Sequence, residues 1–215
     1  MKIEMGESLL YSWLRHVKEC QIAQTNWKAS SQWELKHKDT LKQIMTAFEN
    51  YYQTKYGFTI FKGMSLEQTL KQAEIDVIGI HYSDHQPTVY AIDVAFHEGG
   101  LIYGKKGDTG RQVIKKLLRT ALCIFGYFDI ADGEIIFASP KINNAELQEI
   151  LPLINEIDAL MESIELNFHY KLIANRDFES EILNPIIIRS KGIADTSELF
   201  MRSYQLYRLF GKTEK

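Results

Sequence analysis

Two apolar runs that each contain one aspartate constrain this chain more than any other feature. They read AEIDVIGI and VYAIDVAF, and the polar turn HYSDHQPT separates them. Runs rich in Val and Ile on either side of a turn with Asp84 and Pro87 predict a β-hairpin. Asp76 and Asp93 lie inside the runs, although strand interiors disfavour aspartate and a buried unpaired carboxylate is costly. Two such exceptions on adjacent strands indicate carboxylates brought together, most commonly to bind a divalent cation.

The alternation of side chains along a strand sorts the candidate residues by face. In the second run Asp93, Ala95 and His97 share one face, while in the first run Asp76 shares a face with Ile78. An acid and the residue two positions further on would thus face one metal ion, to which Ala95 can offer its backbone carbonyl. Imidazole titrates near neutral pH, so His97 is a candidate base. A half-exposed histidine at a strand end is the alternative interpretation.

The two aspartates resemble the PD-(D/E)XK nuclease superfamily, which has the restriction-endonuclease-like fold. That family places an Asp at the start of one core strand and an acid, any residue and a lysine on the neighbouring strand. Asp76 matches the first acid and Asp93 the second, whereas Ala95 stands where the family has its lysine. The resemblance covers Phe48 to Pro140, about half of the chain. It implies a nuclease whose Mg²⁺ or Mn²⁺ is held by Asp76 and Asp93.

A helix-borne acid is the next feature that the resemblance implies. The stretch FENYYQTKYGFTIF is similar to Mrr-like members of the superfamily, in which a helix with an FE pair precedes a glycine turn and a strand. By that match Glu49 supports the metal or its water. Glu7 is the rival, because it lies in the first turn of an N-terminal amphipathic helix. A solvated glutamate at position 49, and a glutamate that suits the helix dipole at position 7, are the simpler interpretations.

The absent lysine has candidate substitutes on the helix that follows the second acid. In the superfamily this helix packs near the active site and often supplies a Gln or a basic residue. Lys115 and Lys116 are therefore candidates for a migrated catalytic lysine. A charged, solvent-exposed helix face is the more common explanation for such residues.

A nuclease also needs a local basic patch, because the formal net charge of -3 gives no global attraction to nucleic acid. The loop GGLIYGKKGDTG is rich in glycine and basic residues, but it lacks the Lys-Ser/Thr ending of a phosphate-binding P-loop. We interpret it as a loop over the active site. The residues expected to contact nucleic acid are Lys105, Lys106, Gln112 and Arg119.

The remaining patterns predict an α/β single domain that has a mixed central sheet flanked by helices. Helices are expected at 6–20, 31–56, 111–128, 144–162 and 196–210, while 178–188 is ambiguous. Strands are expected at 58–61, in the two apolar runs, at 134–139 and at 164–174. The segment 21–33 is polar and rich in turn residues, and we expect a loop there. We divide the domain into an N-terminal helical part (1–57), a restriction-endonuclease-like core with the candidate site (58–140) and a C-terminal part (141–215).

Cys20 and Cys123 are expected to be buried thiols. The N-terminus does not have the pattern of a signal peptide, and no apolar run is long enough to span a membrane, so a cytoplasmic protein is expected. DNA is the expected partner, with RNA as the second choice, and self-association is left open. Two functions fit: a Mg²⁺-dependent DNA nuclease, or a module of the same fold with a decayed site that binds nucleic acid or protein without cleavage.

Overall fold

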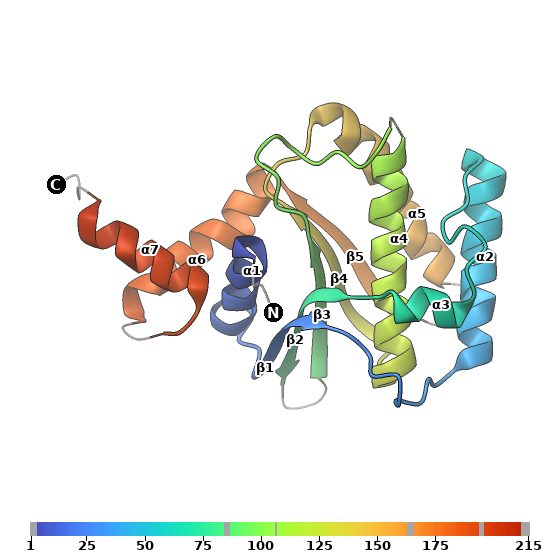
Figure 1. Cartoon of the computed structure of the whole chain (residues 1–215), viewed down its shortest axis with the longest axis horizontal. Helices are drawn as coiled ribbons and strands as arrows, with labels where there is room; N and C mark the ends of the chain where they lie inside the picture. Colours follow the sequence, from blue (N-terminus) through green and yellow to red (C-terminus); the bar gives the residue numbers. More distant parts are fainter. Residues whose placement is uncertain (1–3, 84–86, 106, 163–165, 194–195, 212–215) are drawn as a thin grey trace.

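The computed structural model describes residues 4–83, 87–105, 107–162, 166–193 and 196–211. Their centre is a five-stranded mixed sheet whose strands lie in the order in which they follow along the chain (Figure 1). The second strand is antiparallel to both of its neighbours, and the last three strands are parallel to one another. The strands are β1 (Ile22–Trp27), β2 (Ile75–Tyr82), β3 (Pro87–Val94), β4 (Asp132–Ser139) and β5 (Asn167–Ala174).

Helices cover both faces of the sheet, which makes a single α/β domain of three layers (Figure 1). One layer comprises α2 (Lys38–Tyr56), α3 (Leu66–Lys71), α4 (Asp108–Cys123), a π-helical turn η1 (Ile124–Phe128) and α5 (Asn144–Glu162). The other comprises α1 (Met5–His16), a π-helical segment η2 (Phe178–Leu183), α6 (Asn184–Arg189), a 3₁₀ turn η3 (Ser190–Gly192) and α7 (Leu199–Phe210). No helix in the described part of the chain is long and apolar enough to cross a membrane.

The strand side chains alternate between two hydrophobic cores. Val77, Ile92 and Ile136 pack with α1 and α6, while Ala91 and Phe137 pack with α4 and α5. Because α4 connects the parallel strands β3 and β4, it lies directly against the face that Ala91 and Phe137 share. Any polar side chain on that face of β2 or β3 therefore meets α4.

Helix α4 forms because apolar residues recur at helical spacing along its buried side: Val113, Ile114, Leu117, Leu118, Ala121 and Leu122. Gly110 allows close contact with α5, since a Cβ there would come within 2.8 Å of Cδ1 of Leu153. The residues between the apolar positions are polar or basic, and they are half-buried rather than fully exposed. Helix α4 thus presents a polar side within a packed layer.

The hairpin, the long helix after it, the strand β4 and the helix at Asn144–Glu162 are confirmed. The expected strand at 58–61 is wrong. The backbone N–H groups of Ile60 and Phe61 donate to the carboxylate of Glu49, at 2.8 and 3.0 Å, so a side chain satisfies them instead of a neighbouring strand.

The first strand of the sheet lies instead in the segment expected to be a loop, at Ile22–Trp27. It pairs with β2 and forms the edge of the sheet, and only Trp27 of its residues is buried. An edge strand tolerates polar residues, which explains why its sequence lacks the strand pattern. The predicted helix at 31–56 begins only at Lys38, and the ambiguous segment at 178–188 is helical. Cys20 and Cys123 are buried free thiols, as expected.

Candidate functional site

Asp76 and Asp93 lie side by side on β2 and β3 and face α4. The antiparallel register pairs Val77 with Ile92 and Ile78 with Ala91, which sets Asp76 opposite Asp93. Residues directly opposite each other share a face of the sheet, and Ala91, two residues before Asp93, belongs to the core against α4. The two carboxylates therefore meet on the α4 side of the sheet.

Helix α4 brings a lysine to this pair. The Nζ atom of Lys116 lies 3.1 Å from Oδ1 of Asp93 and 3.9 Å from Oδ2 of Asp76. The hydroxyl of Thr120, one helical turn later, donates to Oδ2 of Asp93 at 2.8 Å. The side chain of Asp93 is 1% exposed, whereas those of Asp76 and Lys116 are 18% and 27% exposed. The site is therefore open to solvent on the side of Asp76 and Lys116.

The backbone of β3 also holds Asp76 in place. The N–H of Val94 donates to Oδ2 of Asp76 at 2.8 Å. Burial, followed by the negative charge of Asp93, raises the pKa of Asp76 from 3.8 to about 6; Lys116 and the Val94 N–H oppose the rise, and Glu7 adds to it. Asp76 is thus ionised at neutral pH but takes up a proton in mildly acidic solution.

Lys116 remains a cation at neutral pH. Burial lowers its pKa, but the charges of Asp93 and Asp76, together with Tyr103, outweigh burial and raise the pKa above its ordinary value. Two carboxylates and one ammonium leave one net negative charge above pH 6. Such a surplus of negative charge favours a cation over an anion on the solvent-exposed side of the site.

The two carboxylates could hold a divalent ion only if water supplied most of its other ligands. Mg²⁺ commonly binds one or two carboxylates and keeps several waters, and Asp76 and Asp93 provide that number. Across residues 4–211, outside the gaps named above, no group of three His, Cys, Asp or Glu side chains is arranged to hold a metal. Ala95 follows β3 with its side chain buried, and its N–H donates to the carbonyl of Ala138. Its carbonyl remains a predicted ligand.

The two candidate glutamates lie in different surroundings. Glu7 accepts a hydrogen bond from Nδ2 of Asn26 at 2.9 Å, and its charge contributes to the raised pKa of Asp76. Glu49 holds the loop after α2 through the N–H groups of Ile60 and Phe61. The structure therefore brings Glu7 into the electrostatic environment of Asp76 and leaves Glu49 with a role in the loop.

The other predicted residues are only partly brought together. Gln112 and Lys116 line a cavity of about 350 Å³ together with Ile102, Tyr103, Gly104 and Asp108.

His97 lies beyond the end of β3, is exposed, and makes an edge-on ring contact with Tyr103 at 6.5 Å. Lys105 is exposed and its N–H donates to Asp108. Lys106 lies outside the described residues. Lys115 and Arg119 lie on the same polar side of α4 as Lys116.

Three residues near the site had not been expected: Thr120, Tyr103 and Asn26. Thr120 is four residues after Lys116, and this helical spacing was the available signal. Burial, with added effects of Asp93 and Asp76 and an opposing effect of Lys116, raises the pKa of Tyr103. Nothing in the sequence marked Asn26, which has a left-handed backbone (φ 53°) and lies between Thr25 and Trp27, the residues of β1 that pair with Val77 and Ile75.

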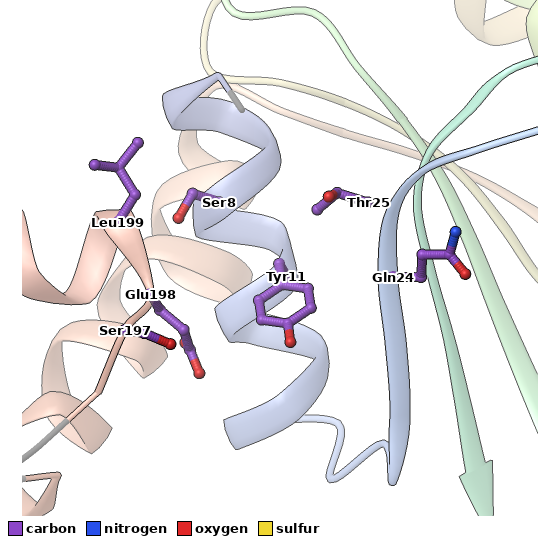
Figure 2. A pocket seen from close by; sticks show the side chains of 7 residues that line it. All are labelled: Ser8, Tyr11, Gln24, Thr25, Ser197, Glu198 and Leu199. Carbon is purple, nitrogen blue, oxygen red and sulfur yellow. The ribbon is translucent and has the colours of Figure 1, made fainter. Parts of the chain in front are cut away.

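A second cavity, of about 390 Å³, lies on the other face of the sheet, between α1, β1 and the start of α7 (Figure 2). Its lining includes Glu198, which is 5% exposed and accepts hydrogen bonds from Ser12 and Arg15. Nε2 of His16 lies 2.9 Å from the same carboxylate. These polar contacts join α7 to α1, so we interpret Glu198 as a structural residue.

Comparison of the chain with protein-family models, with curated proteins and with solved structures gives no match.

Proposed function

We propose that this protein is a metal-dependent nuclease of the PD-(D/E)XK type in which Lys116 on α4 takes the role of the motif lysine. The observation that supports this proposal is the position of the Lys116 ammonium, 3.1 Å from Asp93 and 3.9 Å from Asp76. Two acids on adjacent strands and one lysine are the chemical groups that the family motif combines. Ala95 has no charge to offer at the motif position. Lys116 on α4, the helix that packs against β3, supplies the positive charge instead.

The order of elements supports a restriction-endonuclease-like core. Helix α1 and strands β1, β2 and β3, followed by α4 and β4, give the order helix, strand, strand, strand, helix, strand. Helices α2 and α3 are then an insertion between β1 and β2. In this arrangement the N-terminal helix of the core is α1, so Glu7 is the helix-borne acid of the proposed site.

Each residue has a distinct proposed task. Asp76 and Asp93 would hold Mg²⁺ or Mn²⁺, which supplies Lewis-acid activation of phosphate and water when bound. Lys116 stays protonated near pH 7, so it stabilises negative charge that develops on the phosphate and does not act as the resting base. Thr120 and the Val94 N–H fix the two carboxylates. The proposed substrate is DNA, and RNA is the alternative.

One observation favours a second candidate, a nucleic-acid-binding module without cleavage. Asp93 is 1% exposed, and each of its carboxylate oxygens already accepts a hydrogen bond, one from Lys116 and one from Thr120. An ion pair of this kind also occurs as a purely internal contact that fixes the position of a helix on a sheet. In that case Lys116 would hold α4 against β3 and would not serve chemistry.

The experiment that separates the two candidates is a charge-relocation test. Wild-type protein is incubated with double-stranded DNA, single-stranded DNA and RNA in Mg²⁺ and in Mn²⁺. We expect cleavage of DNA that Asp93→Asn and Lys116→Met each abolish, while Lys171→Met, which removes an exposed lysine paired with Glu134 on β4, leaves it unchanged. Combining Lys116→Met with Ala95→Lys should restore activity, because it returns the cation to the motif position.

Cleavage that survives Asp93→Asn would place the chemistry elsewhere. Absence of cleavage of every substrate, with retained DNA binding, would support the binding module instead.

A further inference from the structure

The polar side of α4 contains more positive charge than the candidate site uses. Lys115 is adjacent to Lys116, and Arg119 follows Lys115 by one helical turn. Residues three and four apart on a helix are neighbours, so Arg119 lies next to both lysines. Lys62, in the loop between α2 and α3, is one of the cations whose charge lowers the pKa of Lys115. We call Lys62, Lys115 and Arg119 the cationic cluster.

In the described part of the chain the cluster forms no ion pair, although the charge of Glu49 acts on Lys115. By contrast, Lys116 is paired with Asp93 and Arg111 with Asp108. Nε of Arg119 is buried without a hydrogen-bond partner. A buried donor without a partner is costly, and an anion bound at the guanidinium is a group that would satisfy it.

Electrostatics agree with this geometry. Burial, and then the neighbouring cations Arg119, Lys62 and Arg111, lower the pKa of Lys115; Glu49 opposes them weakly and is itself bonded to the loop N–H groups. Three cations that outnumber the one nearby carboxylate, that of Glu49, form a local positive potential on a protein whose formal net charge is -3. The potential is therefore local to this part of α4.

The backbone at Lys62 contributes to the arrangement. Lys62 has φ 53° and Gly63 φ 71°, and left-handed geometry at a residue other than glycine is uncommon. The preceding residues are clamped by Glu49, which fixes where the loop turns. The exposed Lys62 side chain thus starts from a backbone position that the neighbouring contacts define.

We propose that Lys62, Lys115 and Arg119 form a phosphate subsite that binds the nucleic-acid backbone beside the scissile position. Lys115 directly precedes Lys116, so a strand whose reacting phosphate lies at the two aspartates places a neighbouring phosphate at the cluster. Arg119 offers a planar fork to the phosphate oxygens, and the two lysines act as point charges. Arg111 is excluded from the subsite because Asp108 already holds its guanidinium at 2.8 Å.

The inference takes its ligand, a phosphodiester strand, from the proposed function, but its test requires no cleavage. The affinity of the protein for a short fluorescent DNA duplex is measured in EDTA over a series of salt concentrations. Lys115→Gln combined with Arg119→Gln should weaken binding and reduce the slope of log K against log salt by about 1 for each lost phosphate contact. Lys62→Gln alone should reduce the slope by about 1, the value expected for one lost phosphate contact.

The matched control is Arg189→Gln combined with Lys191→Gln. It changes the net charge equally, and both residues are exposed in the layer on the other face of the sheet. An equal loss of binding in the control, an unchanged slope in the cluster variants, or no DNA binding by the wild type would each overturn the subsite. If Arg119→Gln unfolds the protein, Lys115→Gln and Lys62→Gln decide the question, each judged by its salt slope.

Failure of the nuclease proposal has a different signature. Suppose that the protein cuts no substrate in Mg²⁺ or Mn²⁺, but the slope of log K against log salt decreases in the cluster variants. The phosphate subsite then stands and the nuclease proposal fails. If the protein cuts DNA and the slope of log K against log salt is unchanged in these variants, the nuclease proposal stands and the subsite fails.

Discussion

The ammonium of Lys116 lies 3.1 Å from Oδ1 of Asp93, and this contact joins the central helix α4 to the strand β3. Asp93 is fully enclosed while Lys116 is 27% exposed, so the pair connects the interior to the surface. The contact therefore serves two purposes that experiments can separate: it neutralises a buried carboxylate, and it places a cation beside Asp76.

The structural purpose predicts a cost for removing one partner. Lys116→Met should lower the free energy of unfolding by about 2–4 kcal/mol at pH 7, because it leaves Asp93 buried without its counter-charge. The double variant Lys116→Met with Asp93→Asn should recover part of that loss, since no buried charge remains. Urea denaturation measures both. Equal stability of wild type and Lys116→Met would mean that the pair contributes little.

The raised pKa of Asp76 predicts a pH-dependent effect of its removal. Between pH 4 and pH 6 the native protein holds a proton that the unfolded chain releases, so stability falls as the pH rises through this window. Asp76→Asn removes this effect. In EDTA, the free energy of unfolding of Asp76→Asn, relative to that of wild type, should therefore rise by about 1–3 kcal/mol as the pH goes from 4 to 8.

The control for this titration is Asp132→Asn, at an exposed position on β4. This substitution removes one carboxylate far along the sheet from the candidate site, and the effect of Asp76→Asn is judged against it. A constant difference for Asp76→Asn over the whole range would show that the carboxylate is not perturbed.

Metal linkage is the third prediction. If Asp76 and Asp93 bind Mn²⁺, adding the ion should raise the melting temperature, by an amount equivalent to about 2.7 kcal/mol at a hundredfold excess over Kd. The shift should decrease below about pH 6, where Asp76 is protonated and cannot ligate. Asp76→Asn with Asp93→Asn should abolish it. A full shift in the double variant would place the ion at another site.

The two glutamates should respond differently to substitution. Glu49→Ala removes the acceptor for the N–H groups of Ile60 and Phe61 and should destabilise the protein by about 1–3 kcal/mol. Glu7→Gln should instead lower the apparent pKa of Asp76 and alter cleavage, because it removes a nearby negative charge. Asp76 titration by NMR and a cleavage assay make the comparison. If Glu49→Ala lost cleavage at unchanged stability while Glu7→Gln kept it, Glu49 and not Glu7 would be the acid that assists the site.

Local periodicity alone was sufficient for several of the elements. The alternation of β2 and β3 predicted that Asp93 and Ala95 share a face, and the helix at Asn144–Glu162 was placed correctly because its apolar stripe and its start are encoded within the segment itself. The edge strand β1 was missed. Its polar residues become a strand through pairing with β2, which is distant in the sequence.

The composition of the candidate site was decided by tertiary structure. The sequence indicated two aspartates and two helix lysines, but adjacent helical residues differ by about 100° in direction, so only the packing of α4 on β3 selects Lys116 over Lys115 as the partner of Asp93. Likewise, Glu7 approaches Asp76 because α1 packs against β1 and β2, while Glu49 turns toward its own loop. The sequence thus determined the chemical groups and their faces, and long-range packing determined which of them meet.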